Sequence, residues 1–454
     1  MKKQFVAALL GIFMLSLVGC GSSTEPLIQD NPVVTTDPQE PLTGVSDPVV
    51  SEPADNRIDS SVVDSINALG FQLYEKAVAS TSDTENMLIS PCSVSIAFSM
   101  LDNAADNSTK EQLEGVLGII DLDDWNSQIH KLLNEEDIIA SAGENSTSAP
   151  KIITSNSLWM DDSLVLSDGA SEDVIDIIKN NYNGDIFTED FADKATADKV
   201  DKWIDDSTKG LIKSLGGDIS NLESLLVNTI YFKASWVSEF DEANTQDRDF
   251  RTNFGTTQVP SMQLVRKNEY YINQDGLEAI SLPYQSYYDK DGVEHGNFEM
   301  VIIKSADEND LTTDRFDSLS IEEKQAFLTA LSEEESATQF KTIQVPRFEY
   351  EYTYDGVKND LISLGMTNVF DSESADLSKL SAGLYVSDVK HKAVISVDEN
   401  GTEAAAMTAL MMDCAMAAPE ELPTKEFIVD KPFTYVIRDV DTGLVYFIGS
   451  VNSL

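Results

Sequence analysis

Cysteine is scarce in this sequence, with three residues among 454. So few cysteines cannot build the disulfide network that holds many small secreted proteins together. Cys92 lies within an apolar run, so we expect it to be a buried core residue. Cys20 and Cys414 lie toward opposite ends of the chain, in segments with other distinctive features. The cysteine content therefore excludes a disulfide-based fold.

Histidine is equally scarce, and the familiar catalytic motifs are missing. The three histidines are His130, His295 and His391. The chain has no nucleophile elbow, no zinc-protease motif and no phosphate-binding loop motif. A weak calcium-loop pattern at Asp289, Asp291 and Glu294 fails the spacing that EF-hand ligands require. We therefore expect no metal, no cofactor and no enzymatic activity, and we expect each histidine to be a core or surface residue.

Basic residues are greatly outnumbered by acidic ones. The chain has 31 Lys and Arg against 79 Asp and Glu, so its formal net charge is -48. A surface this negative repels nucleic acid and anionic lipid headgroups, and no basic cluster offers a site for heparin. The sequence therefore predicts no nucleic-acid partner, and its acidity indicates solubility or salt tolerance.

The N-terminus has the features of a targeting segment. Lys2 and Lys3 precede an apolar run at residues 5–18, which is too short for a typical membrane span. The run ends in Leu17-Val18-Gly19-Cys20, which resembles the lipobox of bacterial lipoprotein signal peptides. The resemblance implies that residues 1–19 are removed and that a lipid on Cys20 anchors the protein to the outer face of a bacterial membrane. An ordinary signal peptide that happens to contain a cysteine is the alternative.

The remainder divides into a tether and one large domain. Residues 20–57 are rich in Pro, Asp, Ser, Thr and Val, which is typical of a disordered linker. Residues 58–454 show helical periodicity early and strand-like runs late, with no internal repeat or second linker. This order predicts a single α+β domain.

Several local patterns predict particular elements. Apolar residues at helical spacing start at Val62, and Pro91 suits the first turn of a second helix. Ser108 has capping-box spacing to a following Glu, so we expect a third helix to begin there and to end near Gly118. Strands are expected at residues 224–236, 298–304, 341–346, 393–397, 433–438 and 445–451, with a hairpin turn at residues 441–443.

One segment between two predicted strands has an unusual composition. Small side chains dominate the first half of residues 399–416, and no aromatic residue anchors the segment. Such a segment could slide between two existing strands, and each backbone hydrogen bond it gained would contribute roughly 0.5–1.5 kcal/mol. An exposed helix or loop rich in Ala and Met fits the composition equally well.

From about residue 60 to its C-terminus the chain resembles the serpins. The segments that carry the resemblance are residues 86–100, 226–237, 345–350, 388–406, 427–433 and 444–452. The resemblance implies the serpin fold, which has three mixed β-sheets, about nine helices and an exposed reactive-centre loop at about residues 399–425. It also implies a metastable protein that acts on a serine protease. The protease cleaves the loop and becomes covalently trapped when the loop inserts into the central sheet.

The resemblance also assigns roles to individual residues. The hinge, which would enter the sheet first, consists of Glu399, Gly401, Thr402, Glu403, Ala404, Ala405 and Ala406. Its small residues suit insertion, because a charged or bulky side chain would have to be buried. Arg347 is expected to pair with Glu399, and Trp236 is expected at the breach, where the hinge enters. The shutter, where the central strands must part, would consist of Ser90, Ser93, Asn228 and His391.

The loop also indicates a target class. The family spacing places the reactive bond at Ala415–Met416, with Cys414–Ala415 and Met416–Ala417 as alternatives. No Arg or Lys lies between residues 399 and 425, so elastase-, chymotrypsin- or subtilisin-like proteases are favoured over trypsin-like ones. The resemblance thus implies a monomeric, extracellular suicide inhibitor. A non-inhibitory surface protein that uses the same fold for binding is the alternative.

Overall fold

The structure, a computed structural model, describes residues 57–145, 149–331, 337–402 and 424–454. These residues form nine α-helices and three β-sheets within one compact unit, Asn56–Leu454. The expected α+β class, with three sheets and about nine helices, is confirmed.

The helices lie mainly in the first half of the chain. They are α1 (Ser60–Ser80), α2 (Pro91–Asp102), α3 (Asn107–Leu117), α4 (Leu122–Asn145), α5 (Ala170–Tyr182), α6 (Lys194–Ser207), α7 (Asp314–Asp317), α8 (Ile321–Leu331) and α9 (Val357–Leu364). Among the described residues, none of these helices combines the length and the apolar composition that crossing a membrane requires.

The starts of α2 and α3 show how local chemistry sets helix boundaries. Pro91 occupies the first turn of α2, and the Ser90 side chain caps it by accepting the Ser93 N–H at 3.3 Å. The predicted start of α3 at Ser108 is wrong. The helix is capped by Asp106, whose carboxylate accepts the Asn107 N–H at 3.0 Å, while the Ser108 hydroxyl accepts a hydrogen bond from Asn368. The predicted end is confirmed, because Gly118 adopts the left-handed conformation there.

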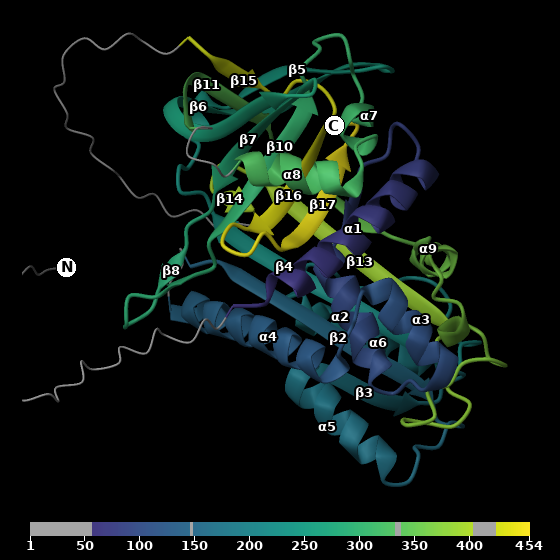
Figure 1. The fold of residues 1–454 in the computed structure, drawn as a ribbon. Coiled ribbons are helices and arrows are strands. Elements are labelled where there is room, and N and C mark those ends of the chain that lie inside the picture. The colour runs from purple at the N-terminus through teal and green to yellow at the C-terminus, as the bar shows by residue number, and fades with distance from the viewer. Residues whose placement is uncertain (1–56, 146–148, 332–336, 403–423) are drawn as a thin grey trace, which may run out of the picture. The chain divides into compact units, whose positions relative to one another are not determined.

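The largest sheet has nine strands and fills the upper part of Figure 1. Its strands in order are β1 (Met87–Ile89), β17 (Val445–Val451), β16 (Phe433–Asp439), β10 (Phe298–Ser305), β7 (Leu277–Pro283), β6 (Gly255–Gln274), β11 (Ala337–Pro346) and β15 (Glu426–Ile428), with β5 (Gln246–Thr252) paired to β6. Strand β11 starts four residues before its predicted position at Lys341. The turn between β16 and β17 forms as predicted, with the Thr442 N–H donated to the Asp439 carboxylate at 2.7 Å.

The second sheet has six strands and positions the candidate site. Its order is β12 (Phe348–Thr353), β13 (Asp388–Val397), β14 (Gly401–Thr402), β4 (Ser224–Ser235), β2 (Lys151–Asp161) and β3 (Gly184–Glu189). A small third sheet, the β8–β9 hairpin, pairs β8 (Tyr287–Tyr288) with β9 (Glu294–His295).

Alternate residues of β4 face two different hydrophobic cores. Leu226, Ile230 and Phe232 belong to the main core, which also contains residues of α1, α2 and the nine-stranded sheet. Leu225 and Val227 belong to a smaller core that includes Val200 and Ile204 of α6. Because both faces are covered, β4 is buried along nearly its whole length.

Candidate functional site

The two central strands of the six-stranded sheet are joined along only part of their length. Strands β13 and β4 pair in parallel through residues 388–392 and 225–229. Beyond this pairing, the short strand β14 lies between them. Thr402 pairs with Val397 on one side and with Ala234 on the other, and Gly401 pairs with Ser235. The two central strands are therefore paired directly at one end of the sheet, and β14 lies between them at the other end.

A turn centred on Asp398 carries the chain from β13 back into the sheet as β14. The Asp398 side chain accepts the N–H groups of Asn400 and Gly401 at 2.8 and 3.2 Å, and its own N–H donates to the Gly401 carbonyl at 2.9 Å. Gly401 is required by space, because a Cβ there would lie 2.0 Å from the carbonyl oxygen of Ala234. The Asn-Gly-Thr sequence thus suits a close antiparallel approach of β14 to β4.

Thr402 is held in place by a tyrosine that the sequence did not single out. Its side chain is 3% exposed, and its hydroxyl lies 2.6 Å from that of Tyr284. Burial raises the pKa of Tyr284, and the hydrogen bond with Thr402 only partly opposes this shift. The phenol therefore stays protonated and can donate to Thr402 at any physiological pH.

The ion pair expected between Glu399 and Arg347 is present. Arg347 Nη2 and Nε lie 2.6 and 2.7 Å from the two carboxylate oxygens, and the Thr245 hydroxyl also donates to this carboxylate. Burial raises the pKa of Glu399, but the hydrogen bonds from Arg347 and Thr245 outweigh it and hold that pKa below its ordinary value. A buried carboxylate at the start of the turn is thus kept ionised by a bidentate partner.

Trp236 directly follows the last residue of β4 and packs against the turn at Asp398. Its indole Nε1 donates to the Asp398 carbonyl at 3.0 Å, and its backbone N–H donates to Asn400 at 2.9 Å. The indole stacks on Tyr284 with ring centroids 4.4 Å apart. Trp236, Tyr284 and Thr402 therefore form one packed group where β14 joins the sheet.

The four predicted shutter residues also meet, around the imidazole of His391. The Ser90 N–H donates to Nε2 at 3.1 Å, and Nδ1 lies 3.1 Å from the Asn228 side-chain oxygen. Since Nε2 accepts, Nδ1 carries the proton and donates to Asn228. The Asn228 amide in turn donates to the Ser93 carbonyl at 2.9 Å and to Asn156 at 2.7 Å.

This network fixes the charge state of His391. The ring is buried, and burial lowers its pKa to about 4. A neutral ring matches its partners, because a second N–H would face the Ser90 N–H. The hydroxyls of Ser90 and Ser93 form their described hydrogen bonds within the first turn of α2 and not with the ring. Asn156 is a further member that the sequence analysis missed. It is a polar residue in a buried strand, which was the signal available.

The remaining predicted site residues lie outside the described part of the chain. These are Cys20, Glu403, Ala404, Ala405, Ala406, Cys414, Ala415, Met416 and Ala417.

The residues of the calcium-loop pattern form hydrogen bonds in and beside the β8–β9 hairpin. One Asp289 oxygen accepts the N–H groups of Asp291 and Val293 at 2.8 and 2.9 Å, and Glu294 accepts the Ser286 hydroxyl. Within the part of the chain that the structure describes, no group of three or more His, Cys, Asp or Glu residues is placed to hold a metal ion.

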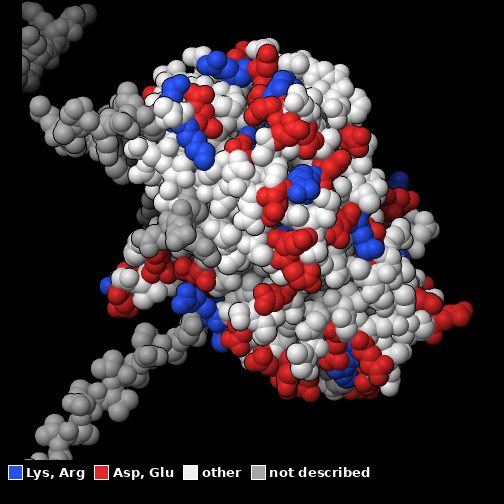
Figure 2. All heavy atoms as spheres, turned by 45° about the horizontal axis from the view of Figure 1, so that its top comes forward, with Lys and Arg blue, Asp and Glu red and all other residues white. Residues whose placement is uncertain are grey.

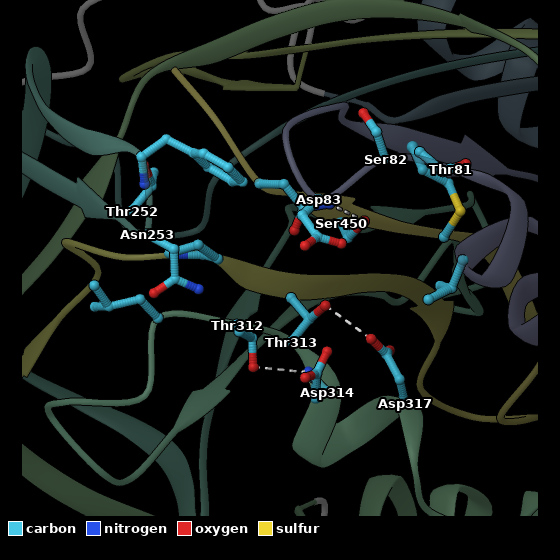
Figure 3. Close-up of a pocket in the computed structure, with 16 residues that line it drawn as sticks. Thr81, Ser82, Asp83, Thr252, Asn253, Thr312, Thr313, Asp314, Asp317 and Ser450 are labelled. Atoms are coloured by element: carbon cyan, nitrogen blue, oxygen red, sulfur yellow. Dashed lines mark hydrogen bonds between the residues drawn. The ribbon is translucent and has the colours of Figure 1, made fainter.

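A separate hollow of about 110 Å³ lies between the end of α1, the β5–β6 turn, α7 and β17 (Figure 3). Hydroxyl and carboxylate groups make up much of its lining, and several bond to one another. Thr313 donates to Asp317 at 2.8 Å, and Thr312 accepts the Asp314 N–H at 3.3 Å. None of the predicted site residues that the structure describes lines this hollow. Figure 2 shows that Asp and Glu side chains also predominate over Lys and Arg on the face it displays.

Comparison with known proteins identifies relatives with this architecture. Residues 64–454 match a family model described as Serpin (serine protease inhibitor). An uncharacterised serpin-like protein of Thermococcus kodakarensis is 31% identical, and the match covers 86% of this chain and 85% of that protein. The leukocyte elastase inhibitor of Xenopus tropicalis is 30% identical over 84% of this chain and 97% of its own.

Solved structures agree with these sequence matches. The native state of tengpin, a thermophilic serpin, superposes with a TM-score of 0.70 at 28% identity, covering 89% of this chain and 96% of tengpin. The native stressed conformation of Arabidopsis AtSerpin1 superposes with a TM-score of 0.69 at 26% identity, covering 87% of this chain and 99% of that one.

Proposed function

This chain belongs to the serpin family, whose members are generally protease inhibitors rather than enzymes, and we propose that it is an irreversible suicide-substrate inhibitor of extracellular serine proteases. The hinge and the loop that follows it would insert into the six-stranded sheet after cleavage and carry the covalently attached protease with them.

The position of Thr402 is the observation that carries the proposal. This residue already pairs with strands on both of its sides, and its side chain is buried. Beyond the β13–β4 pairing, no ladder joins residues 393–396 of β13 directly to residues 230–233 of β4 in the described structure. The residues that follow Thr402 could therefore extend an existing strand into this interval. Each new backbone hydrogen bond would contribute roughly 0.5–1.5 kcal/mol.

The register of β14 predicts where each later residue would lie. Antiparallel pairing with Ala234 on β4 and with Val397 on β13 can be continued one residue at a time. Both series bring Thr408 to the same level, opposite Asn228 on one side and His391 on the other. Insertion past this level would have to break the hydrogen bond between Asn228 and His391.

The same register distributes side chains over the two faces of the sheet. Ala404 and Ala406 would follow Thr402 on the main-core face, level with Phe232 and Ile230. Small side chains suit this buried face. The charged residue Glu403 would lie on the opposite face, level with Lys233, which is partly exposed. The hinge composition is therefore compatible with insertion on both faces.

The loop sequence supports a target class. Because no Arg or Lys lies between residues 399 and 425, a protease with a shallow apolar specificity pocket fits best. We place the reactive bond at Ala415–Met416, with the two neighbouring bonds as alternatives, and expect a monomer. The elastase inhibitor among the relatives is consistent with this class.

Incubation with pancreatic elastase tests the proposal. An SDS-stable complex should form together with a cleaved inhibitor, and elastase blocked beforehand at its active-site serine should form none. Mass spectrometry of the released C-terminal peptide would identify the bond. If elastase- and subtilisin-type enzymes only digest the loop without complex formation, the proposal fails.

We also propose that the protein is a bacterial surface lipoprotein anchored through Cys20. The lipobox-like sequence at residues 17–20 and the Pro- and Ser-containing segment behind it support this location. A Cys20→Ser variant should lose incorporation of radiolabelled fatty acid and leave the membrane fraction. Unchanged labelling of that variant would overturn the anchor.

A further inference from the structure

His295 lies between two carboxylates that come from different elements. It ends the β8–β9 hairpin, and its side chain is 10% exposed. Nδ1 lies 2.7 Å from Glu135 Oε1 on α4, and Nε2 lies 3.6 Å from Asp289 Oδ2 on the hairpin itself. Tyr287 stacks on the ring, with centroids 6.1 Å apart.

A neutral imidazole cannot satisfy this arrangement. A carboxylate only accepts hydrogen bonds, so Nδ1 must carry the proton that Glu135 receives. Nε2 would then present a lone pair toward Asp289, and it is buried without a hydrogen-bond partner in the described structure. Protonation of Nε2 would supply a donor to Asp289 and place one positive charge between two negative ones.

The groups that face the two ring nitrogens are both carboxylates. The ion pairs that the structure describes for Glu135 and Asp289 are both formed with His295. The N–H of Val293, and more weakly that of Asp291, hold the pKa of Asp289 below its ordinary value, so this carboxylate stays ionised.

Several other titratable groups on α4, in the hairpin or beside Glu135 are acidic or phenolic, and each has a hydrogen-bond partner or is deeply buried. Glu136 on α4 bonds to Thr154, Glu294 bonds to Ser286, Asp439 bonds to Thr442, and Asp441 bonds to Asn297. Burial raises the pKa of Tyr446 on β17, which therefore stays neutral. None of these groups is a cation that would repel a protonated His295 ring.

The base of the same hairpin reaches the place where β14 enters the sheet. The Gln285 N–H donates to the Ser235 carbonyl at 2.8 Å, and its side chain donates to the Trp236 carbonyl at 3.2 Å. The preceding residue, Tyr284, forms an isolated β-bridge with Trp236, and its hydroxyl group contacts that of Thr402. The hairpin thus connects α4 at its far end with the entry of the hinge at its base.

We propose that His295 is a proton-operated clamp, which fastens the β8–β9 hairpin to α4 when its ring is cationic and loosens it when the ring is neutral. The clamp would restrict the motion of residues 284–286. Through these residues it would also hold Thr402 in its position between β13 and β4. It is a property of the folded chain and does not depend on the inhibitory function proposed above.

Hydrogen–deuterium exchange at pH 8 and at pH 5 tests the clamp. After correction for the intrinsic rate, amides of residues 285–297 should exchange about tenfold more slowly at the acidic end, which corresponds to about 1.4 kcal/mol. Peptides covering residues 398–402 should slow in parallel. His295→Gln keeps a donor for Glu135 but cannot gain a charge, so the protection of its hairpin should change with pH clearly less than that of the wild type.

Two further variants keep the test decisive. His130→Gln alters the other histidine of this region, which lies on α4 and contacts Asn134, and it should retain the full pH response. Asp289→Asn removes one of the two carboxylates and should reduce the response even if His295→Gln disturbs the hairpin. A wild-type hairpin whose protection is independent of pH, or an equal response in Asp289→Asn and wild type, would overturn the clamp.

Discussion

The hydroxyl groups of Tyr284 and Thr402 lie 2.6 Å apart and are buried, although 118 positions separate the two residues. This contact fixes Thr402, one of the predicted hinge residues, in the sheet of the intact chain. It also joins the hinge to Trp236, on which Tyr284 stacks. Gly401 and Thr402 of the predicted hinge are therefore paired as a strand within the sheet.

A charge at position 402 should prevent insertion. Thr402→Arg would place a guanidinium against Tyr284 in the main core, where an unpaired charge is strongly unfavourable. We expect the SDS-stable complex with elastase to fall about tenfold or more, while loop cleavage continues. Thr402→Ser, which keeps the hydroxyl group, should inhibit normally. Equal complex formation by the arginine variant would contradict the role of this residue.

A methyl group at position 401 should expel β14 from the sheet. In Gly401→Ala the new Cβ would lie 2.0 Å from the Ala234 carbonyl oxygen and 2.8 Å from the Ser235 Cα. We expect amides of residues 401 and 402 to exchange at least about tenfold faster than in the wild type. Gly115→Ala on α3 is the matched control, since nothing lies within 4 Å of its Cβ. Unchanged exchange in Gly401→Ala would mean that β14 is not paired with β13 and β4 in solution.

Protonation of His391 should destabilise the folded state. Its folded pKa is about 4 against an ordinary value of 6.5, so the unfolded chain binds the proton more tightly. The contribution of His391 to stability is present above pH 6.5 and is lost as the pH falls toward 4, by about 3 kcal/mol. In urea titrations, the stability of the wild type relative to His391→Gln should decrease by this amount over that interval. A constant difference would exclude a buried neutral ring.

Glu136 should show the opposite dependence. Burial raises its pKa to about 7 despite two hydrogen bonds from Thr154, so the folded state prefers the protonated carboxyl. Its contribution to stability is present below pH 4.5 and is lost as the pH rises through 7, by about 3 kcal/mol. Relative to Glu136→Gln, the wild type should therefore weaken between pH 4.5 and 8. Between about pH 5 and 6.5 the titrations of His391 and Glu136 change the stability in opposite directions and partly cancel in the wild type. The single variants are therefore needed to measure each contribution.

A basic residue before the reactive bond should redirect the inhibitor. Ala415→Arg should lose activity against elastase and form SDS-stable complexes with trypsin, whose pocket requires a basic side chain. Ala417→Arg is the positional control, because it moves the basic residue two positions along the loop. If Ala417→Arg forms more trypsin complex than Ala415→Arg, the reactive bond lies further toward the C-terminus than proposed.

The sequence predicted the main elements, since their signals are local. The first turn of α2 follows from Ser90 and Pro91, and the turn at residues 441–443 follows from its Asp-Thr-Gly sequence. Strand β13 begins at Asp388, earlier than the apolar pattern indicated, because Lys390, His391 and Lys392 belong to the strand. Lys390 pairs with Asp388 on the same strand, whereas His391 and Lys392 have partners from elsewhere in the chain, which no local pattern reveals.

The candidate site was predictable only in part. Family resemblance indicated the pairing of Glu399 with Arg347, and the structure contains that ion pair. The seating of Thr402 against Tyr284 depends on a contact across 118 positions, and no periodicity indicates such a contact. Asn156 was missed for the same reason, because its partner Asn228 lies on a neighbouring strand, 72 positions away.

Thermal unfolding of the intact and loop-cleaved protein tests the central claim most directly. The claim is that residues beyond Thr402 add a strand between β13 and β4 once the loop is cut. About ten new backbone hydrogen bonds would contribute on the order of 10 kcal/mol, so the unfolding midpoint should rise by at least about 10 °C after cleavage. An unchanged midpoint would contradict insertion and would favour a serpin-fold surface binding protein that does not trap proteases.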